Sequence, residues 1–97
     1  MDDTQIIWDD DPGKNVEHCL EHDVTAEEVE EVLLNRRNAV IPGELDDRFV
    51  TFGYTSAGRY LLVAWISVLD DPRTIYPVTS YEVPEPQRTP KRKRRGR

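Results

Sequence analysis

Residues 48–69 read RFVTFGYTSAGRYLLVAWISVL, and this stretch decides the fold. Its first part alternates in the period-two pattern of a β-strand, which places Val50, Phe52 and Tyr54 on one face. The letters TSAG then predict a hairpin turn. The run from Arg59 to the end of the stretch is apolar on both faces, which is typical of a central strand. We therefore expect an antiparallel hairpin whose second strand lies in the middle of a sheet.

Two further strands are predicted on either side of this hairpin. Asp70-Asp71-Pro72 forms a turn, and the RTIYPVTSYEV segment after it has the pattern of a third meander strand. Pro77 lacks a backbone donor, so this strand should have an irregularity there or a water-facing edge. Thr4–Trp8 (TQIIW) predicts a short strand near the N-terminus.

Two helices are predicted between the first strand and the hairpin. Asp11 followed by proline favours a helix that begins at Pro12 and ends near Glu21 or His22. Its apolar stripe would consist of Val16, Cys19 and Leu20. A lone cysteine in such a stripe is typical of a small buried residue.

The second helix has the stronger signals. Thr25 followed three residues later by Glu28 is a capping box, and Val24 with Val29 can form a hydrophobic staple. The helix should end near Asn35. The fold class is therefore α+β: two N-terminal helices packed on an antiparallel sheet in the order β-α-α-β-β-β, with a disordered basic C-terminal tail.

Charge divides the chain into a body, residues 1–83, and a tail, residues 84–97. The ten residues from position 88 hold seven of the 13 Lys and Arg residues and no acid, so residues 1–87 carry six basic against 19 acidic residues, a balance of −13. An acidic body repels phosphate, whereas the tail predicts an arm that binds nucleic acid or folds back onto the body. The cationic tail residues are Arg88, Lys91, Arg92, Lys93, Arg94, Arg95 and Arg97.

The letters HCLEH, residues 18–22, fit H-x-x-E-H, the signature of a class of zinc peptidases. On the predicted helix both His18 and His22 lie outside the apolar stripe. A zinc site needs at least three protein ligands, and Cys19 should point to the core. We therefore predict no metal site and no cofactor.

The order IIWDDD, K, HCLEHDVTAEEVEEVL, RFVTFGYTSAGRYLLVAWISV and IYPVTSYEV resembles the BrnT-like toxin family, small proteins of the RelE-like ribonuclease toxin fold. The resemblance covers residues 6 to about 83. It implies a cognate antitoxin as partner, RNA as substrate and a cytoplasmic location. It also implies a catalytic set of Arg48 and Arg59 with His18, His22 and Tyr81 as acid/base groups.

Three hypotheses follow from the residues and the resemblance. The first is a toxin with ribonuclease or RNA-binding activity. The second, favoured because basic positions of the family are replaced here, is a divergent member that acts as a non-catalytic protein-interaction module. The third is a zinc site at HCLEH. No apolar run approaches the roughly 20 residues of a membrane span, and one cysteine fits a reducing cytoplasm.

Overall fold

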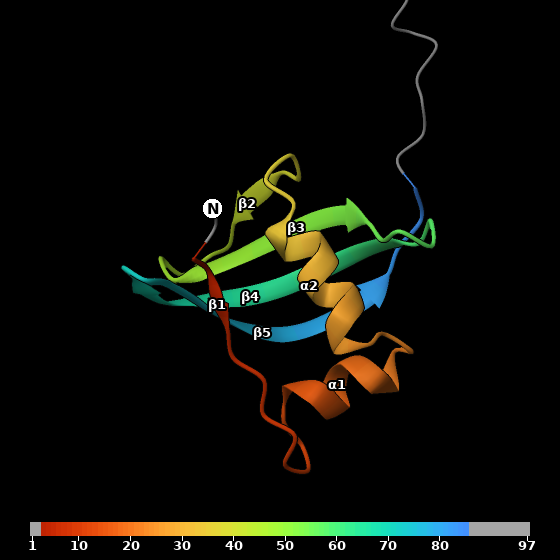
Figure 1. Ribbon diagram of the computed structural model, residues 1–97, viewed down its shortest axis with the longest axis horizontal. Helices are drawn as coiled ribbons and strands as arrows, with labels where there is room; N and C mark the ends of the chain where they lie inside the picture. The colour runs from red at the N-terminus through yellow and green to blue at the C-terminus, as the bar shows by residue number, and fades with distance from the viewer. Residues whose placement is uncertain (1–2, 86–97) are drawn as a thin grey trace, which may run out of the picture.

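The computed structural model describes residues 3–85, which form one five-stranded sheet and two helices (Figure 1). The elements are β1 (Gln5–Ile6), α1 (Asn15–Glu21), α2 (Ala26–Leu34), β2 (Val40–Pro42), β3 (Arg48–Tyr54), β4 (Tyr60–Asp70) and β5 (Arg73–Glu82). The strand order is β1-β5-β4-β3-β2, so β4 is central as predicted. The α+β class is confirmed.

Helix α2 forms as its sequence predicts. The Thr25 hydroxyl accepts the backbone N–H of Glu28 at 3.2 Å, and the Glu28 carboxylate accepts the backbone N–H of Thr25 at 3.1 Å. This capping box satisfies two donors that the first helical turn leaves unpaired. Val29, Val32 and Leu33 are buried on the face that packs on the sheet.

Helix α1 begins three residues later than predicted, because the backbone at Gly13 is left-handed with φ +78° and cannot belong to a right-handed helix. The N-cap is Lys14, which makes no side-chain cap, so the predicted cap at Asp11 and start at Pro12 are wrong. The predicted stripe is also partly wrong. Leu20 is 55% exposed, whereas Cys19 is buried as predicted.

Asn15, a polar residue, lies on the buried face of α1, where the prediction had placed only apolar residues. It is completely buried, and its amide nitrogen donates to the carbonyl oxygens of Ile7 and Pro77, each at 2.9 Å. Its side-chain oxygen accepts the backbone N–H of Asp9 at 2.8 Å. Asn15 thus connects α1, the segment after β1 and β5 through three hydrogen bonds.

The hairpin and the meander are confirmed, with one irregularity where it was predicted. In the β4–β5 register Trp65 pairs with Pro77 and Ala64 with Thr79, so Val78 is an extra residue beside the proline. Two features differ from the prediction. The sheet is mixed, because β1 runs parallel to β5, and β2 is an additional strand that its three-residue length concealed.

Strand β2 forms one edge of the sheet, next to β3. The Gly43 N–H donates to the Arg48 carbonyl oxygen at 2.8 Å. Because antiparallel pairing alternates along a strand, the neighbouring Pro42 directs its nitrogen to the outer edge. Proline has no N–H, so this edge lacks a donor at that position.

The core lies between the helices and one face of the sheet. Figure 1 shows α2 crossing β3 and β4, while α1 lies beside β5. The buried apolar residues are Cys19, Val24, Val29, Val32, Leu33, Leu61, Val63, Trp65 and Ile75. Trp65 is 4% exposed and its indole N–H donates to Thr51 at 2.8 Å.

Candidate functional site

The face of the sheet that points away from the helices carries many apolar side chains. We call it the open face. Cross-strand partners point to the same side of a sheet, and the register places on it Ile41, Arg48, Val50, Phe52, Tyr54, Tyr60, Leu62, Ala64, Ile66, Tyr76, Val78, Thr79 and Tyr81. Arg48 is the only charged residue of this set. The acidic residues of α1 and α2 belong to the helix layer.

Period-two alternation predicts that Val50, Phe52 and Tyr54 share a face, and the structure confirms this. It does not put that face in the core. The helices cover Thr51 and Gly53 of the same strand, whereas Val50 and Phe52 stay half-buried and Tyr54 is 49% exposed. Sequence alternation therefore identified an apolar face of the strand. It did not show that no other layer of the described residues covers this face.

One end of the open face carries a group of rings, which we call the aromatic group: Phe52, Tyr54 and Tyr60. The ring centroids of Tyr54 and Tyr60 are 4.7 Å apart, and those of Phe52 and Tyr60 are 6.1 Å apart. Rings at these separations support one another by stacking or tilted contact. The aromatic group is therefore packed and partly exposed.

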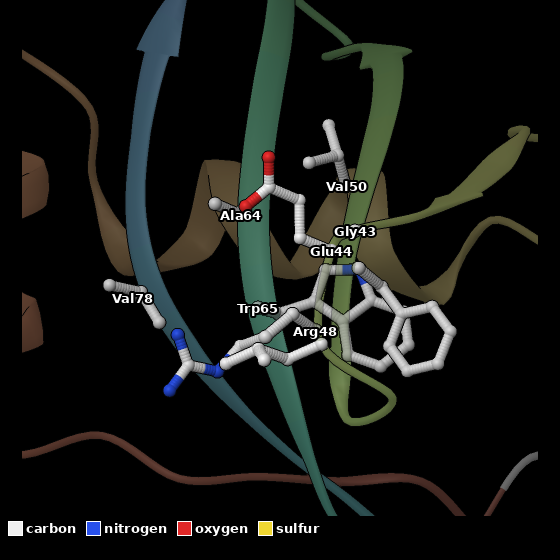
Figure 2. Close-up of a pocket in the computed structure, with 9 residues that line it drawn as sticks. Gly43, Glu44, Arg48, Val50, Ala64, Trp65 and Val78 are labelled. Carbon is white, nitrogen blue, oxygen red and sulfur yellow. The ribbon is translucent and has the colours of Figure 1, made fainter.

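A hollow of about 310 Å³ lies further along the strands. Its residues include Val50, Ala64 and Val78 from the sheet, and Glu44, Leu45 and Arg48 from β3 and the segment before it. Figure 2 shows α2 behind the strands and the side chains of Val50, Ala64 and Val78 on the opposite side. The hollow therefore belongs to the open face, with an apolar floor, a carboxylate and a guanidinium.

The predicted catalytic residues fall into two separate places. Three of them, His22, Arg59 and Tyr81, lie at the end of the sheet where β4 begins and β5 ends. The His22 and Tyr81 rings are 5.4 Å apart, and Arg59 donates to the carbonyl oxygen of Asp23, next to His22, at 2.9 Å. The structure thus brings together part of the set that the resemblance implies.

Arg59 in this group is already paired with carboxylates. Its Nη1 lies 2.9 Å from both carboxylate oxygens of Glu28, and its Nε lies 3.2 Å from Glu82. Burial raises the pKa of Glu28, but the Thr25 backbone N–H and Arg59 outweigh burial and hold that pKa below its ordinary value. A phosphate at Arg59 would have to displace or repel these carboxylates.

The other two predicted catalytic residues lie apart from this group. Arg48 begins β3, six residues or roughly 20 Å along the strand from Tyr54, and it pairs with Asp47 at 3.5 Å. His18 is exposed on α1 and lies 3.8 Å from the Glu21 carboxylate. The structure does not assemble the five residues in one site.

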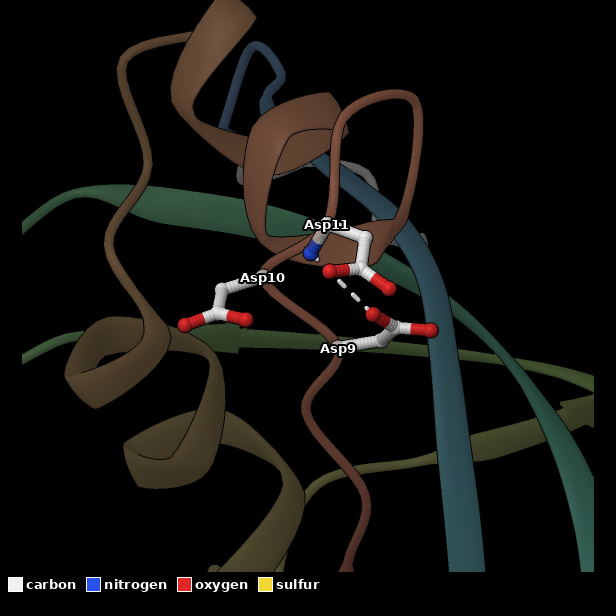
Figure 3. A group of neighbouring side chains, drawn as sticks. All are labelled: Asp9, Asp10 and Asp11. Atoms are coloured by element: carbon white, nitrogen blue, oxygen red, sulfur yellow. Dashed lines mark hydrogen bonds between the residues drawn. The ribbon is translucent and has the colours of Figure 1, made fainter.

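Within residues 3–85, the structure places no third possible metal ligand beside the two histidines of the HCLEH segment. The one group of three or more possible ligands there is Asp9, Asp10 and Asp11, shown in Figure 3, whose oxygens lie within 4.8 Å of one another. The Asp9 carboxylate accepts the backbone N–H of Asp11 at 3.1 Å, so local turn formation accounts for that contact. Such exposed carboxylates are ordinary without a metal.

Cys19 is 1% exposed and carries a free thiol. Burial raises the pKa of this thiol, and a backbone hydrogen bond from Ser80 opposes the rise only in part. A buried thiol that stays protonated is a poor nucleophile. The structure therefore agrees with the prediction of a small core residue.

The seven cationic residues from Arg88 to Arg97 lie outside the described residues, so the nucleic-acid arm stays a prediction. Within residues 3–85 no helix has the length and hydropathy to cross a membrane. Comparison with protein-family models, with curated proteins and with solved structures gave no match.

Proposed function

We propose that this protein is a non-catalytic protein-interaction module that binds a protein partner through the open face. The observation that carries the proposal is the composition of that face: thirteen positions on four strands with one charge, Arg48. A sheet normally buries its apolar face against another layer. The open face has the apolar composition of a sheet face that packs against another layer. Within residues 3–85, no layer covers it.

The size of the open face fits a binding surface. Four strands about 4.8 Å apart and seven residues at about 3.3 Å each give a flat area of roughly 400 Å². Contiguous apolar patches of this size on soluble proteins are often interaction sites. Tyrosine and phenylalanine, which interfaces use for large contact area, are present as Phe52, Tyr54, Tyr60 and Tyr76.

The electrostatics of the body support a protein partner over RNA. Residues 1–87 carry a balance of −13, and the best-placed cation, Arg59, is neutralised by Glu28 and Glu82. Phosphate contacts dominate nucleic-acid affinity. A reducing cytoplasm, which suits a single buried cysteine, goes with this proposal.

A ribonuclease toxin with a cognate antitoxin is the second candidate function. The contact between His22 and Tyr81, close to Arg59, favours it. An acid/base pair beside a cation is an arrangement that can cleave RNA. For this to work, the guanidinium of Arg59 would have to leave its carboxylates.

Matched substitutions on the two faces test the proposal. Leu62→Glu places a charge on the open face, whereas Leu34→Glu places one on α2, where Leu34 is 42% exposed. Proteins that co-purify with the tagged full chain should be identified by mass and rebuilt from purified components. We expect one stoichiometric partner whose affinity falls at least about tenfold with Leu62→Glu and stays unchanged with Leu34→Glu.

Two outcomes contradict the proposal. One is a partner whose binding is indifferent to Leu62→Glu in a variant that keeps the wild-type circular dichroism spectrum. The other is RNA cleavage by purified wild-type protein that Arg59→Ala removes. The second outcome would establish the ribonuclease in place of the interaction module.

A further inference from the structure

The two ends of the open face differ. The aromatic group lies at the end where β3 meets β4 across the hairpin turn, and Tyr54 is 49% exposed there. The hollow of about 310 Å³ lies around Val50 and Ala64. From Val50 to Tyr54 is four residues, or about 13 Å along the strand. One chain therefore carries both an exposed aromatic ring and a hollow that can receive one.

We propose that a second copy of this chain occupies the open face, in a two-fold symmetric dimer in which Tyr54 of each copy enters the hollow of the other. This inference rests on the proposed function, since it names the protein that the open face binds. A two-fold axis in the plane of the interface, perpendicular to the strands, exchanges the two ends of the face. The same contact then occurs twice, as an isologous interface requires.

The chemistry of the hollow suits a tyrosine. Val50, Ala64 and Val78 offer an apolar floor to the ring. Glu44 and Arg48 provide a carboxylate and a guanidinium, and a phenol hydroxyl can donate to the first or accept from the second. A buried tyrosine keeps its hydroxyl paired in this way.

Charge placement permits two acidic bodies to meet on this side. The acidic residues of α2, namely Glu27, Glu28, Glu30 and Glu31, lie in the helix layer. On the open face, Arg48 is the one charged residue of the strands, and Glu44 beside the hollow carries the opposite charge. Contact through the open faces therefore keeps the two helix layers, where like charges repel, on the outer sides of the dimer.

The available area sets the expected strength. A flat area of roughly 400 Å² per copy is about half of the roughly 800 Å² per partner that a standard stable interface buries. We therefore expect a weak, reversible dimer with a correspondingly high dissociation constant. Sedimentation equilibrium of the purified full chain between low and high micromolar concentration measures it.

Two single variants and their mixture test the arrangement. Tyr54→Ser removes the aromatic ring that enters the hollow, and Ala64→Glu blocks the hollow with a charge. Each variant alone should dimerise at least about tenfold more weakly than the wild type. In a mixture, the hollow of the Tyr54→Ser copy still receives Tyr54 of the Ala64→Glu copy. The mixed dimer therefore keeps one of two contacts and should be stronger than either homodimer.

A cross-link gives an independent reading. The axis midway between Val50 and Tyr54 passes near Leu62, which pairs with Phe52, so Leu62→Cys residues of two copies should face each other. A short bismaleimide should join them, whereas Leu34→Cys on α2 should give no cross-linked dimer. Cys19 is buried and does not interfere.

The outcomes separate this inference from the proposed function. A chain that stays monomeric at high micromolar concentration overturns the dimer, and a different partner lost with Leu62→Glu would leave the proposed function standing. A dimer that Tyr54→Ser and Ala64→Glu do not weaken, or a mixture no stronger than the single variants, also overturns the arrangement. A chain with neither a second copy nor another protein on the open face overturns both proposals.

Discussion

Arg59 and Glu28 form an ion pair in which one guanidinium nitrogen lies 2.9 Å from both carboxylate oxygens, and this pair joins the start of β4 to the first turn of α2. The same glutamate completes the capping box with Thr25. One carboxylate thus fixes both the helix start and the position of the helix on the sheet. The residue that the resemblance makes catalytic has a structural role here.

The Arg59–Glu28 pair should make stability depend on pH in a predictable direction. The pKa of Glu28 lies below its ordinary value, so the stabilisation is present above about pH 4.5 and is lost as pH falls through the lower folded-state pKa. We expect Glu28→Gln to cost about 1 to 2 kcal/mol at neutral pH. Between about pH 5 and pH 3 the gap to the wild type should shrink.

Urea unfolding at several pH values measures this gap. Glu27→Gln is the matched control, since Glu27 is an exposed acid of the same helical turn. A gap that is constant from neutral to acidic pH would show that the pair does not act through the charge of Glu28.

Asn15 should be among the most sensitive positions for stability. Asn15→Ala removes three hydrogen bonds and leaves the carbonyl oxygens of Ile7 and Pro77 without this buried partner. We expect a loss of about 2 to 4 kcal/mol in the free energy of unfolding. Urea unfolding, with the exposed Gln5→Ala as control, measures the loss, and a cost below about 1 kcal/mol would contradict the role of Asn15 as a clamp.

The thiol of Cys19 should be protected in the folded protein. Because burial raises its pKa and blocks access, we expect its reaction with a disulfide reagent at mildly alkaline pH to be at least about a hundredfold slower than in denaturant. Ser56→Cys in a Cys19→Ala background is the exposed control. Equal rates for the two cysteines would show that α1 opens readily from β5.

The predicted nucleic-acid arm can be tested without any assumption about its structure. Deleting residues 88–97 removes seven positive charges. If these residues bind nucleic acid, affinity for a single-stranded oligonucleotide should fall and its salt dependence should flatten. Fluorescence anisotropy over a range of salt concentrations measures both the affinity and its salt dependence. Unchanged curves would show that residues 88–97 do not bind nucleic acid.

Local signals predicted the parts of this fold whose interactions are local. The Thr25 capping box and the hairpin at residues 55–58 depend on neighbours in sequence, and both form as expected. The start of α1 depends on the left-handed backbone at Gly13 and on Asn15, whose partners include an atom 62 residues away, so the cap signal at Asp11 and Pro12 did not locate it. Leu20 continues the apolar stripe in the sequence and was therefore predicted to be buried, but it is exposed.

The candidate site was the least predictable part. Alternation in β3 identified an apolar face, but the number of layers that cover it depends on where α1 and α2 pack. The aromatic group and the hollow also depend on the register between β3 and β4, and this register cannot be read from the sequence. Arg59 was named only as a catalytic candidate implied by the resemblance, which stays a prediction. Its pairing with Glu28 requires the helix to cross the sheet at one particular place.

Pro42 on strand β2 limits what kind of assembly the sheet can join. Lateral growth, in which a strand of another molecule extends the sheet, needs a continuous row of backbone donors and acceptors along its rim. The proline interrupts that row at the β2 rim. Another molecule cannot extend the sheet continuously from this rim, so a partner that meets the sheet on the β2 side has to dock on a face instead of adding a strand.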